Sequence, residues 1–403
     1  MSKDTTFIGQ PIFLQVMKLL SRDEIKSAEL SKSTNRYIKK FTGYNHLVTL
    51  LFSVFANCDS LREVVVGMLS LSNKLRHLGL TYLVKRSTLS DANKRRSSEF
   101  FAQLYAHLYN KYAGILSDSR YKAGRQNKLY IIDSTTITLF KQILRGAGRN
   151  PKRGKKKGGM KVHTLIASDE NIPRMIIMSS AATHDHIILK KLDLPEYSFI
   201  VFDRAYVDYS QYETFTAKNI TYVTKLKKNA KHTPISELDM PLGTDNNILI
   251  DEEVEFKYGE NRSLVHRARR IAYWDSSNKR VIEYLTNNFE IRAEQVVDIY
   301  FRRWQIESLF KQLKQSFQLK YFLGDNINAI ESQVWVVMIA NLLVSVIKKG
   351  VKRECSYTGI VSLIRLQLMS YISLFDLLEK PEKAWLELLE KERRKERLFP
   401  SLF

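Results

Sequence analysis

The sequence predicts an α/β fold with a mixed β-sheet, preceded and followed by helical segments. Short apolar runs rich in β-branched residues begin at residue 128, and helical and strand patterns alternate between residues 185 and 226. Residues 1–125 instead space their apolar side chains as packed helices do. A second β-rich stretch and further helices complete the chain, so we expect a mixed-sheet core between helical parts.

Bulk composition restricts the classes of partner. The 403 residues include 64 Lys and Arg against 42 Asp and Glu, and the net charge of +22 favours nucleic acid over the weaker alternative, a membrane surface. The longest apolar segment, Val334–Ile347, is interrupted by Asn341 and Ser345, so we interpret it as a buried helix that spans no membrane. Cys58 and Cys355 alone exclude a disulfide framework. No signal peptide is evident, and we expect a cytoplasmic location.

Residues 1–125 are predicted to form a helical N-terminal domain that binds DNA. His46–Ala56 is an apolar helix, and Ser60 with Glu63 predicts a capping box that opens the next one. Ser87 is expected to cap a helix that leads into another at 100–112. This pair is similar to a helix-turn-helix reader, although simple packing is the stronger interpretation of this stretch alone. The exposed cations of its first helix would be Arg86, Lys94, Arg95 and Arg96.

The predicted core contains two apolar strands that end in an acid, Leu129–Asp133 and Ser198–Asp203. The run Ser134–Phe140 alternates like a further strand. Because an unpaired buried charge is costly, an acid in this place is typically a functional residue or a helix cap. The other core elements are expected at 161–168 and 172–179 (a hairpin), 185–192 and 207–217 (helices) and 220–226 (a strand).

The segment Lys141–Lys161 carries nine Lys and Arg and no acid. It repels itself and cannot pack on itself, which predicts a loop. A solvated charged loop is one interpretation, but the length and uniform sign favour phosphate binding. The candidates there are Lys155, Lys156 and Lys157.

Residues 227–283 alternate apolar and polar side chains between turns and are predicted to be a β-rich insertion. The catalytic core would then comprise residues 126–226 and 284–330, and residues 331–403 would form a helical C-terminal region. The segment Ile291–Leu323 has no Pro or Gly and predicts one long helix. At about 100° per residue, four polar side chains leave one face of this helix: Tyr300, Arg303, Glu307 and Lys314. Beside them runs an apolar stripe that should be buried, made of Ile306, Phe310, Leu313 and Phe317.

Three carboxylates stand out as one candidate site, although only the fold could bring them together: Asp133, Asp203 and Glu307. They would repel one another unless divalent cations joined them, and hard oxygen ligands favour Mg²⁺ or Mn²⁺. Together with the basic composition, this predicts two-metal phosphoryl transfer on nucleic acid. A capping or salt-bridge role for the aspartates and a solvated charged face around Glu307 remain the alternatives.

The polar face of the long helix resembles the Y-R-E-K signature of the insertion-sequence-four family of DDE transposases, at the spacing Tyr300-x2-Arg303-x3-Glu307-x6-Lys314. Three further segments resemble that family's first-acid motif, second-acid motif and following strand: Ile132–Thr135, Val201–Tyr206 and Tyr222–Lys227. Ala205 departs from the Gly that many members carry. The resemblance covers most of the chain. It implies an RNase H-like core and cut-and-paste transposition through hairpinned transposon ends.

Carried over residue by residue, the resemblance implies that the three carboxylates ligate two Mg²⁺, which Mn²⁺ could replace. It implies DNA contacts for Tyr300, Arg303, Lys314 and Arg204, with an ion pair to Glu307 as the alternative for Arg303 and Lys314. A displaced base would need an aromatic platform, for which Trp274 is the candidate, whereas Trp304 is expected to pack.

The implied partner is double-stranded DNA, as terminal inverted repeats and target DNA, bound by a homodimer at the bacterial nucleoid. Two other functions stay open: a nuclease of the same fold without strand transfer, and a DNA-binding protein without catalysis, which the complete acidic triad disfavours. The histidines are expected to be ordinary strand and loop residues rather than metal ligands: His163, His184 and His186.

Overall fold

A computed structural model of the chain describes residues 10–36, 38–117, 128–138, 159–240, 245, 247–317, 319 and 322–398. The chain divides into two compact units. The helical unit contains Met1–Leu116 and Gln312–Phe403, and the sheet unit contains Ser117–Lys311. The N-terminal and C-terminal parts of the chain therefore belong to one compact unit, whereas the sequence predicts them as separate regions.

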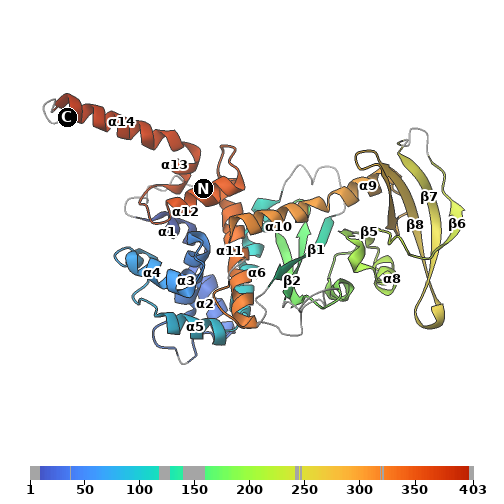
Figure 1. The fold of residues 1–403 in the computed structure, drawn as a ribbon, viewed down its shortest axis with the longest axis horizontal. Coiled ribbons are helices and arrows are strands. Elements are labelled where there is room, and N and C mark those ends of the chain that lie inside the picture. The colour runs from blue at the N-terminus through green and yellow to red at the C-terminus, as the bar shows by residue number, and fades with distance from the viewer. Residues whose placement is uncertain are drawn as a thin grey trace. The chain divides into compact units, whose positions relative to one another are not determined.

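The helical unit is built around one long helix, α11 (Ile327–Gly350), against which α3, α6 and α12 pack (Figure 1). Its other described helices are α1 (Ile12–Met17), α2 (Arg22–Ser31), α3 (Gly43–Ala56), α4 (Leu61–Ser70), η1 (Leu75–Leu78), α5 (Arg86–Arg95), α6 (Glu99–Leu116), α12 (Tyr357–Leu366), α13 (Leu374–Glu379) and α14 (Pro381–Leu398).

The buried helix predicted at 334–347 is confirmed and is longer than expected, because α11 has 24 residues. Of the helices the structure describes, α11 is the one long and apolar enough to cross a membrane by length and composition. In the helical unit 83% of its most apolar window is buried. Its apolar side chains therefore supply the core of this unit.

The predicted helix starts are partly right. Ser60 accepts a hydrogen bond from the Glu63 N–H at 3.2 Å, as a cap should, but the Glu63 carboxylate accepts from the Asp59 N–H instead of closing the box. The Ser87 cap is wrong: α5 begins at Arg86, and no side chain caps it. Arg96, expected on the surface, is buried and donates to backbone carbonyls, among them that of Thr42 at 2.7 Å. Its alkyl chain and guanidinium thus pack α5 against the unit.

The described strands form one nine-stranded sheet with the order β3-β2-β1-β4-β5-β9-β8-β7-β6. In the first five strands, β1 is parallel to β4 and β4 to β5, whereas β2 is antiparallel to both neighbours. This is the mixed α/β sheet that the sequence predicts, and its RNase H-like architecture is confirmed. The strands are β1 (Leu129–Thr138), β2 (Gly159–Ala167), β3 (Pro173–Ser180), β4 (Phe199–Phe202), β5 (Thr221–Lys225), β6 (Thr233–Glu237), β7 (Ile248–Tyr258), β8 (Leu264–Asp275) and β9 (Arg280–Thr286).

Two core elements differ from expectation. The runs predicted as separate strands at 129–133 and 134–140 form one strand, β1, as far as Thr138, and the last two residues of the second run lie outside the described residues. The pairing of β1 with β2 continues without a break from Tyr130 to Thr138, because no turn residue interrupts this segment. The helix expected at 185–192 is the 3-10 helix η2 (Asp185–Lys191). Between β4 and β5 come η3 (Arg204–Tyr206) and α8 (Tyr209–Ala217), where a helix is predicted.

The β-rich insertion extends the core sheet. Its last strand, β9, pairs with β8 on one side and with β5 on the other, so the insertion and the core share one sheet (Figure 1). The buried ion pair between Arg269 and Asp251 ties β8 to β7, with the Arg269 Nε 2.7 Å from Oδ1. Arg269 also donates to the Ile291 carbonyl at 2.6 Å, just before the helix that follows.

The single helix predicted at Ile291–Leu323 is wrong, because two helices occupy this region: α9 (Ala293–Phe301) and α10 (Trp304–Ser316). At the junction, the N–H groups of Arg303 and Gln305 bond the carbonyls three residues before them, each at 3.0 Å. No Pro or Gly marks this break. Arg303 is instead buried at the junction by its ion pairs. The predicted apolar stripe is buried at all four positions.

Candidate active site

The neighbouring parallel strands β1 and β4 bring Asp133 and Asp203 side by side. In the parallel pair of β1 and β4, Ile132 lies opposite Phe202, so the next residue on each strand is an aspartate. Asp133 lies within β1, and Asp203 follows β4 directly and begins η3. Both carboxylates thus project from adjacent backbone positions that are 70 residues apart in sequence.

Tyr300, at the end of α9, is 1% exposed and donates its hydroxyl hydrogen to Asp203 Oδ1 at 3.4 Å. Its ring packs on Tyr284 of β9, with ring centres 5.0 Å apart. Burial, opposed by Arg303, raises the pKa of Tyr300 above its usual value. The phenol is therefore a neutral donor that orients Asp203.

Arg303 joins the remaining two acids. Its Nη1 lies 2.9 Å from Asp133 Oδ2, and its Nη2 lies 2.5 Å from Glu307 Oε1. Burial lowers the pKa of Arg303, but Tyr300 and the two carboxylates raise it by more, so the net shift is upward and the cation is retained. The ion pair with Glu307 is the alternative that the sequence analysis kept for Arg303.

The pKa of Asp133 shows how close the acids are. The pKa of Asp133 is raised to about 6 in all: burial raises it most, the Ser134 N–H and Arg303 lower it, and the charges of Asp203 and Glu307 add to the rise. The Ser134 N–H donates to Asp133 Oδ1 at 2.7 Å. The charges of Asp203 and Glu307 therefore both act on Asp133.

Their chemistry fits a hard divalent cation, although in the described part of the chain no three His, Cys, Asp or Glu side chains are arranged to hold a metal ion. The guanidinium of Arg303 bonds two of the acids and takes the place of a cation between them. Its Nε is buried and has no acceptor within the described residues. In this structure Arg303 thus offsets the charge of Asp133 and Glu307 through one oxygen of each carboxylate.

Lys225 is a site residue to which the sequence analysis gave no role. It ends β5, next to the strand that carries Asp203, and its Nζ lies 4.8 Å from the centre of the Tyr300 ring. Burial lowers the pKa of Lys225, and Arg303 lowers it further. A basic residue at the end of the next parallel strand is the signal that could have identified it, since such strand ends share one edge of a sheet.

The other residues predicted to contact DNA in this part of the chain are at least partly exposed. Arg204 is exposed directly after Asp203, and Lys314 is exposed further along α10. Trp274 on β8 is 37% exposed. The expectation that Trp304 packs is wrong, because it is 59% exposed.

In the helical unit, Arg86 and Arg95 are exposed at the two ends of α5, and Arg95 pairs with Asp91 at 2.8 Å. Lys155, Lys156 and Lys157 lie outside the described residues. His184 stacks on His186. His163 lies on β2, as predicted, where it is 1% exposed and hydrogen-bonded through both ring nitrogens.

Comparisons with known proteins show the family to which the chain belongs. The family model described as "Transposase DDE domain" matches residues 124–343, more than half of the chain. A second model, a domain of unknown function (DUF4372), matches residues 8–81. A protein described as a transposase from Sinorhizobium fredii is 29% identical over 64% of this chain and 70% of its own length.

Two further relatives are described as transposases of insertion sequence elements. The one from Geobacillus stearothermophilus is 25% identical over 59% of this chain and 61% of its own length. The one from Synechocystis sp. is 26% identical over 70% of this chain and 76% of its own length. A solved structure of a piggyBac transposase synaptic complex with hairpin DNA has a TM-score of 0.40 and 12% identity, and the match covers 94% of this chain and 82% of that one.

The match to the transposase DDE domain over more than half of the chain defines an enzyme of the DDE class. The chain belongs to the transposase DDE domain family and is a DNA transposase.

Proposed function

We propose that the chain is a member of the insertion-sequence-four branch and catalyses cut-and-paste transposition with Asp133, Asp203 and Glu307 as ligands of two Mg²⁺ ions, which Mn²⁺ can replace. The observation that carries this proposal is that Arg303 joins Asp133 to Glu307, while the charges of Asp203 and Glu307 both raise the pKa of Asp133. Bound Mg²⁺ would activate the attacking oxygen and stabilise the leaving oxygen of the phosphodiester.

The chain's own residues have separate tasks in this proposal. Tyr300 orients Asp203, and Arg303, once released from an acid, offers a bidentate fork to a phosphate. Lys225 adds a second cation close to Tyr300, and Arg204 and Lys314 supply exposed charges for the DNA backbone. Water first attacks at the transposon end, and the freed 3′-hydroxyl then attacks the opposite strand to form a hairpin and release the flanking DNA. A second water opens the hairpin and frees the 3′-hydroxyl again, which finally attacks and joins target DNA. Trp274 is the proposed platform for the base that hairpin formation displaces.

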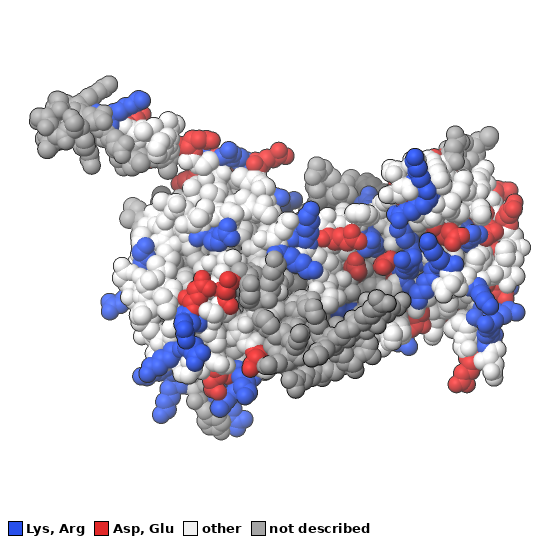
Figure 2. Space-filling model, in the orientation of Figure 1, with Lys and Arg blue, Asp and Glu red and all other residues white. Residues whose placement is uncertain are grey.

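The helical unit offers a basic cleft of about 800 Å³ that supports its proposed role in binding terminal inverted repeats. Its charged lining residues are Lys32, Arg36, Lys39, Lys40, Arg95, Arg96 and a single acid, Asp91. Figure 2 shows basic side chains gathered at the lower left, where Figure 1 places α2 and α5. Such a surface suits the phosphates of duplex DNA. Arg86, at the start of α5, would extend it.

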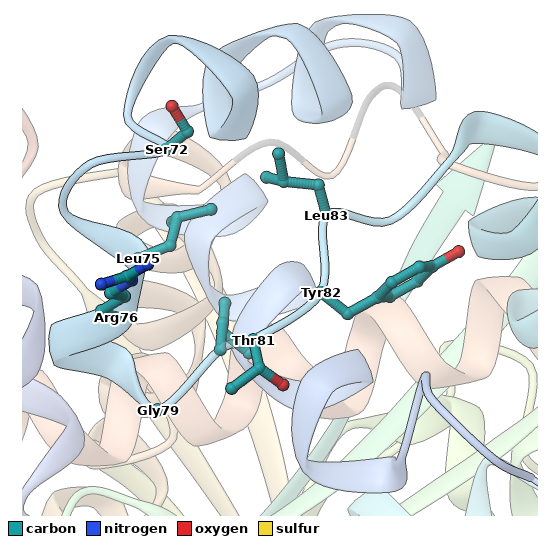
Figure 3. Close-up of a pocket in the computed structure, with 8 residues that line it drawn as sticks. Ser72, Leu75, Arg76, Gly79, Thr81, Tyr82 and Leu83 are labelled. Atoms are coloured by element: carbon teal, nitrogen blue, oxygen red, sulfur yellow. The ribbon is translucent and has the colours of Figure 1, made fainter.

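A second hollow of about 580 Å³ lies between Ser72 and Leu83. Tyr82 lines both hollows, and Figure 3 shows its ring directed away from Arg76. Apart from Arg76, the lining side chains are uncharged, so we assign the DNA contact to the basic cleft. We further propose that the protein acts as a homodimer in the DNA complex, in the cytoplasm at the nucleoid.

The test uses the inverted repeats that flank the gene as a labelled duplex, incubated with the purified full chain and Mg²⁺. We expect end nicking, a hairpin, and joining of the labelled 3′ end to a target plasmid. Asp133→Asn should abolish all three while it still retards the duplex on a gel. Nicking without joining would favour the nuclease, and unchanged cleavage by Asp133→Asn would overturn the assignment.

A further inference from the structure

A chain of buried hydrogen bonds lies behind the two aspartates and links three segments of the sheet unit. The hydroxyl of Tyr206, in η3, lies 3.1 Å from His163 Nδ1, on β2. On the other side of the ring, His163 Nε2 lies 2.9 Å from Ser179 Oγ, on β3. Tyr206 and His163 are each 1% exposed, so water cannot replace these bonds at low cost.

The direction of these bonds follows from their partners. Burial lowers the pKa of His163 to about 4, so the ring is neutral at pH 7 and has one donor and one acceptor nitrogen. Because the Ser179 hydroxyl donates to the Ser180 carbonyl at 3.3 Å, its oxygen accepts from His163 Nε2–H. Nδ1 therefore accepts from the Tyr206 hydroxyl, whose oxygen is free to accept from the side chain of Ser134.

A buried ion pair lies beside His163, at the end of the hydrogen-bond chain away from the aspartates. Lys161 Nζ lies 2.8 Å from Asp185 Oδ1 and also donates to the Thr183 carbonyl at 2.9 Å. Asp185 Oδ1 is 3.9 Å from His163 Nδ1. Lys161 is two residues from His163 on β2, so this pair fixes η2 against the strand that carries the imidazole.

At its other end, the hydrogen-bond chain contacts the segments that carry Asp133 and Asp203. Ser134, which follows Asp133, is the cross-strand partner of His163 in the ladder of β1 and β2. Tyr206 closes a tight turn with Asp203, since its N–H donates to the Asp203 carbonyl at 3.0 Å. The Tyr206 hydroxyl thus connects the turn that begins at Asp203 to the strand position next to Asp133.

We propose that Tyr206 and His163 are positioning residues that hold Asp133 and Asp203 at the separation that a shared divalent cation requires. This inference rests on the proposed metal site. Neither residue touches the reacting atoms; Tyr206 acts through Ser134 and the backbone of Asp203, and His163 acts through Tyr206. Partners of this kind orient the ligands of metal sites and contribute to affinity.

The test measures Mn²⁺ affinity of the full chain without DNA, by the electron paramagnetic resonance of free Mn²⁺. Tyr206→Phe removes one hydroxyl and keeps the ring, and we expect Mn²⁺ to bind about 10-fold to 100-fold more weakly. Higher Mn²⁺ should restore nicking. Tyr357→Phe is the matched control, because it also loses a buried hydroxyl bond, 2.8 Å long, to Asn341 in the helical unit. It should leave the affinity unchanged.

His163→Leu is the second variant and should weaken Mn²⁺ binding in the same direction as Tyr206→Phe. The double variant with Tyr206→Phe and His163→Leu should bind Mn²⁺ no more weakly than the single variant with the lower affinity, because both substitutions break the same chain of hydrogen bonds. If Tyr206→Phe fails to fold, His163→Leu decides alone. Wild-type affinity in a folded variant would overturn the positioning role. Failure of the wild-type chain itself to bind Mn²⁺ would instead overturn the proposed metal site.

Discussion

The guanidinium of Arg303 bonds the carboxylate of Asp133 at 2.9 Å across 170 residues of sequence. The same guanidinium pairs with Glu307 one helical turn further on. One buried cation therefore neutralises part of the charge of the acidic site and fixes the start of α10 against β1.

Arg303→Ala should lower the free energy of unfolding by about 3 kcal/mol in metal-free buffer, because Asp133, whose side chain is 18% exposed, is left without its cation. Arg303→Lys should recover only part of the loss, since an ammonium cannot bond both acids as a fork does. Urea unfolding measures both. The Asp133→Asn/Arg303→Ala double variant should be more stable than Arg303→Ala alone. Additive losses would show that the two residues are not coupled.

Glu307→Gln should reduce end cleavage at least about 100-fold, because it removes one charged ligand worth several kcal/mol in the transition state. Its effect on stability should stay below about 1 kcal/mol, since the Glu307 side chain is 40% exposed. Glu387→Gln is the control, because Glu387 also forms an i,i+4 ion pair, with Lys383. Near-normal cleavage by Glu307→Gln would remove Glu307 from the site.

The helical unit should lose stability in acid because of His46. Burial lowers the pKa of this residue to about 3, with Arg96 lowering it further and Asn93 opposing the shift. Its Nε2–H donates to Asn93 at 2.7 Å, while the buried Nδ1 has no partner in the described chain, so an added proton would have no acceptor.

The unfolded chain protonates His46 below about pH 6.5 and the folded chain does not, so stability falls as the pH drops through that range toward 3. At pH 4.5 the loss of stability from this linkage is about 3 kcal/mol. His46→Gln should therefore lose about 3 kcal/mol less than the wild type between pH 7.5 and 4.5 in urea unfolding. Equal losses would contradict the assignment.

Charge reversal in the basic cleft should weaken DNA binding. Lys39→Glu with Lys40→Glu should reduce affinity for any duplex and make the salt dependence shallower by about one to two units of slope, because fewer phosphates are neutralised. Fluorescence anisotropy at several salt concentrations measures both. Lys349→Glu on α11 carries a like change on an exposed lysine and should have a smaller effect. An unchanged slope would place the DNA elsewhere.

The sequence predicts the mixed sheet and the three acids well, because each rests on a local pattern. Asp133 and Asp203 end apolar runs, and Glu307 lies beside a stripe that is buried in the structure. The break between α9 and α10 has no such signal. It depends on Arg303 reaching Asp133, a contact between residues far apart in sequence.

The hydrogen-bond partner of His163 also could not be predicted from a local pattern. The alternating strand residues around His163 do not show that Tyr206, from another part of the chain, donates to its ring. Ser87 shows the opposite error: a good capping residue lies one position inside α5, where the backbone of the loop before it sets the start of the helix. Local sequence propensity therefore predicts neither the partner of His163 nor the first residue of α5.

The detour of the chain through β6 to β9 has a consequence for biosynthesis. Synthesis adds both aspartates to the chain before the insertion, and Tyr300, Arg303 and Glu307 only after it. The pairing of β9 with β5, which brings the chain back from the insertion, joins strands far apart in sequence, and such pairings form slowly. A nascent or truncated polypeptide that stops inside the insertion therefore carries Asp133 and Asp203 without Glu307.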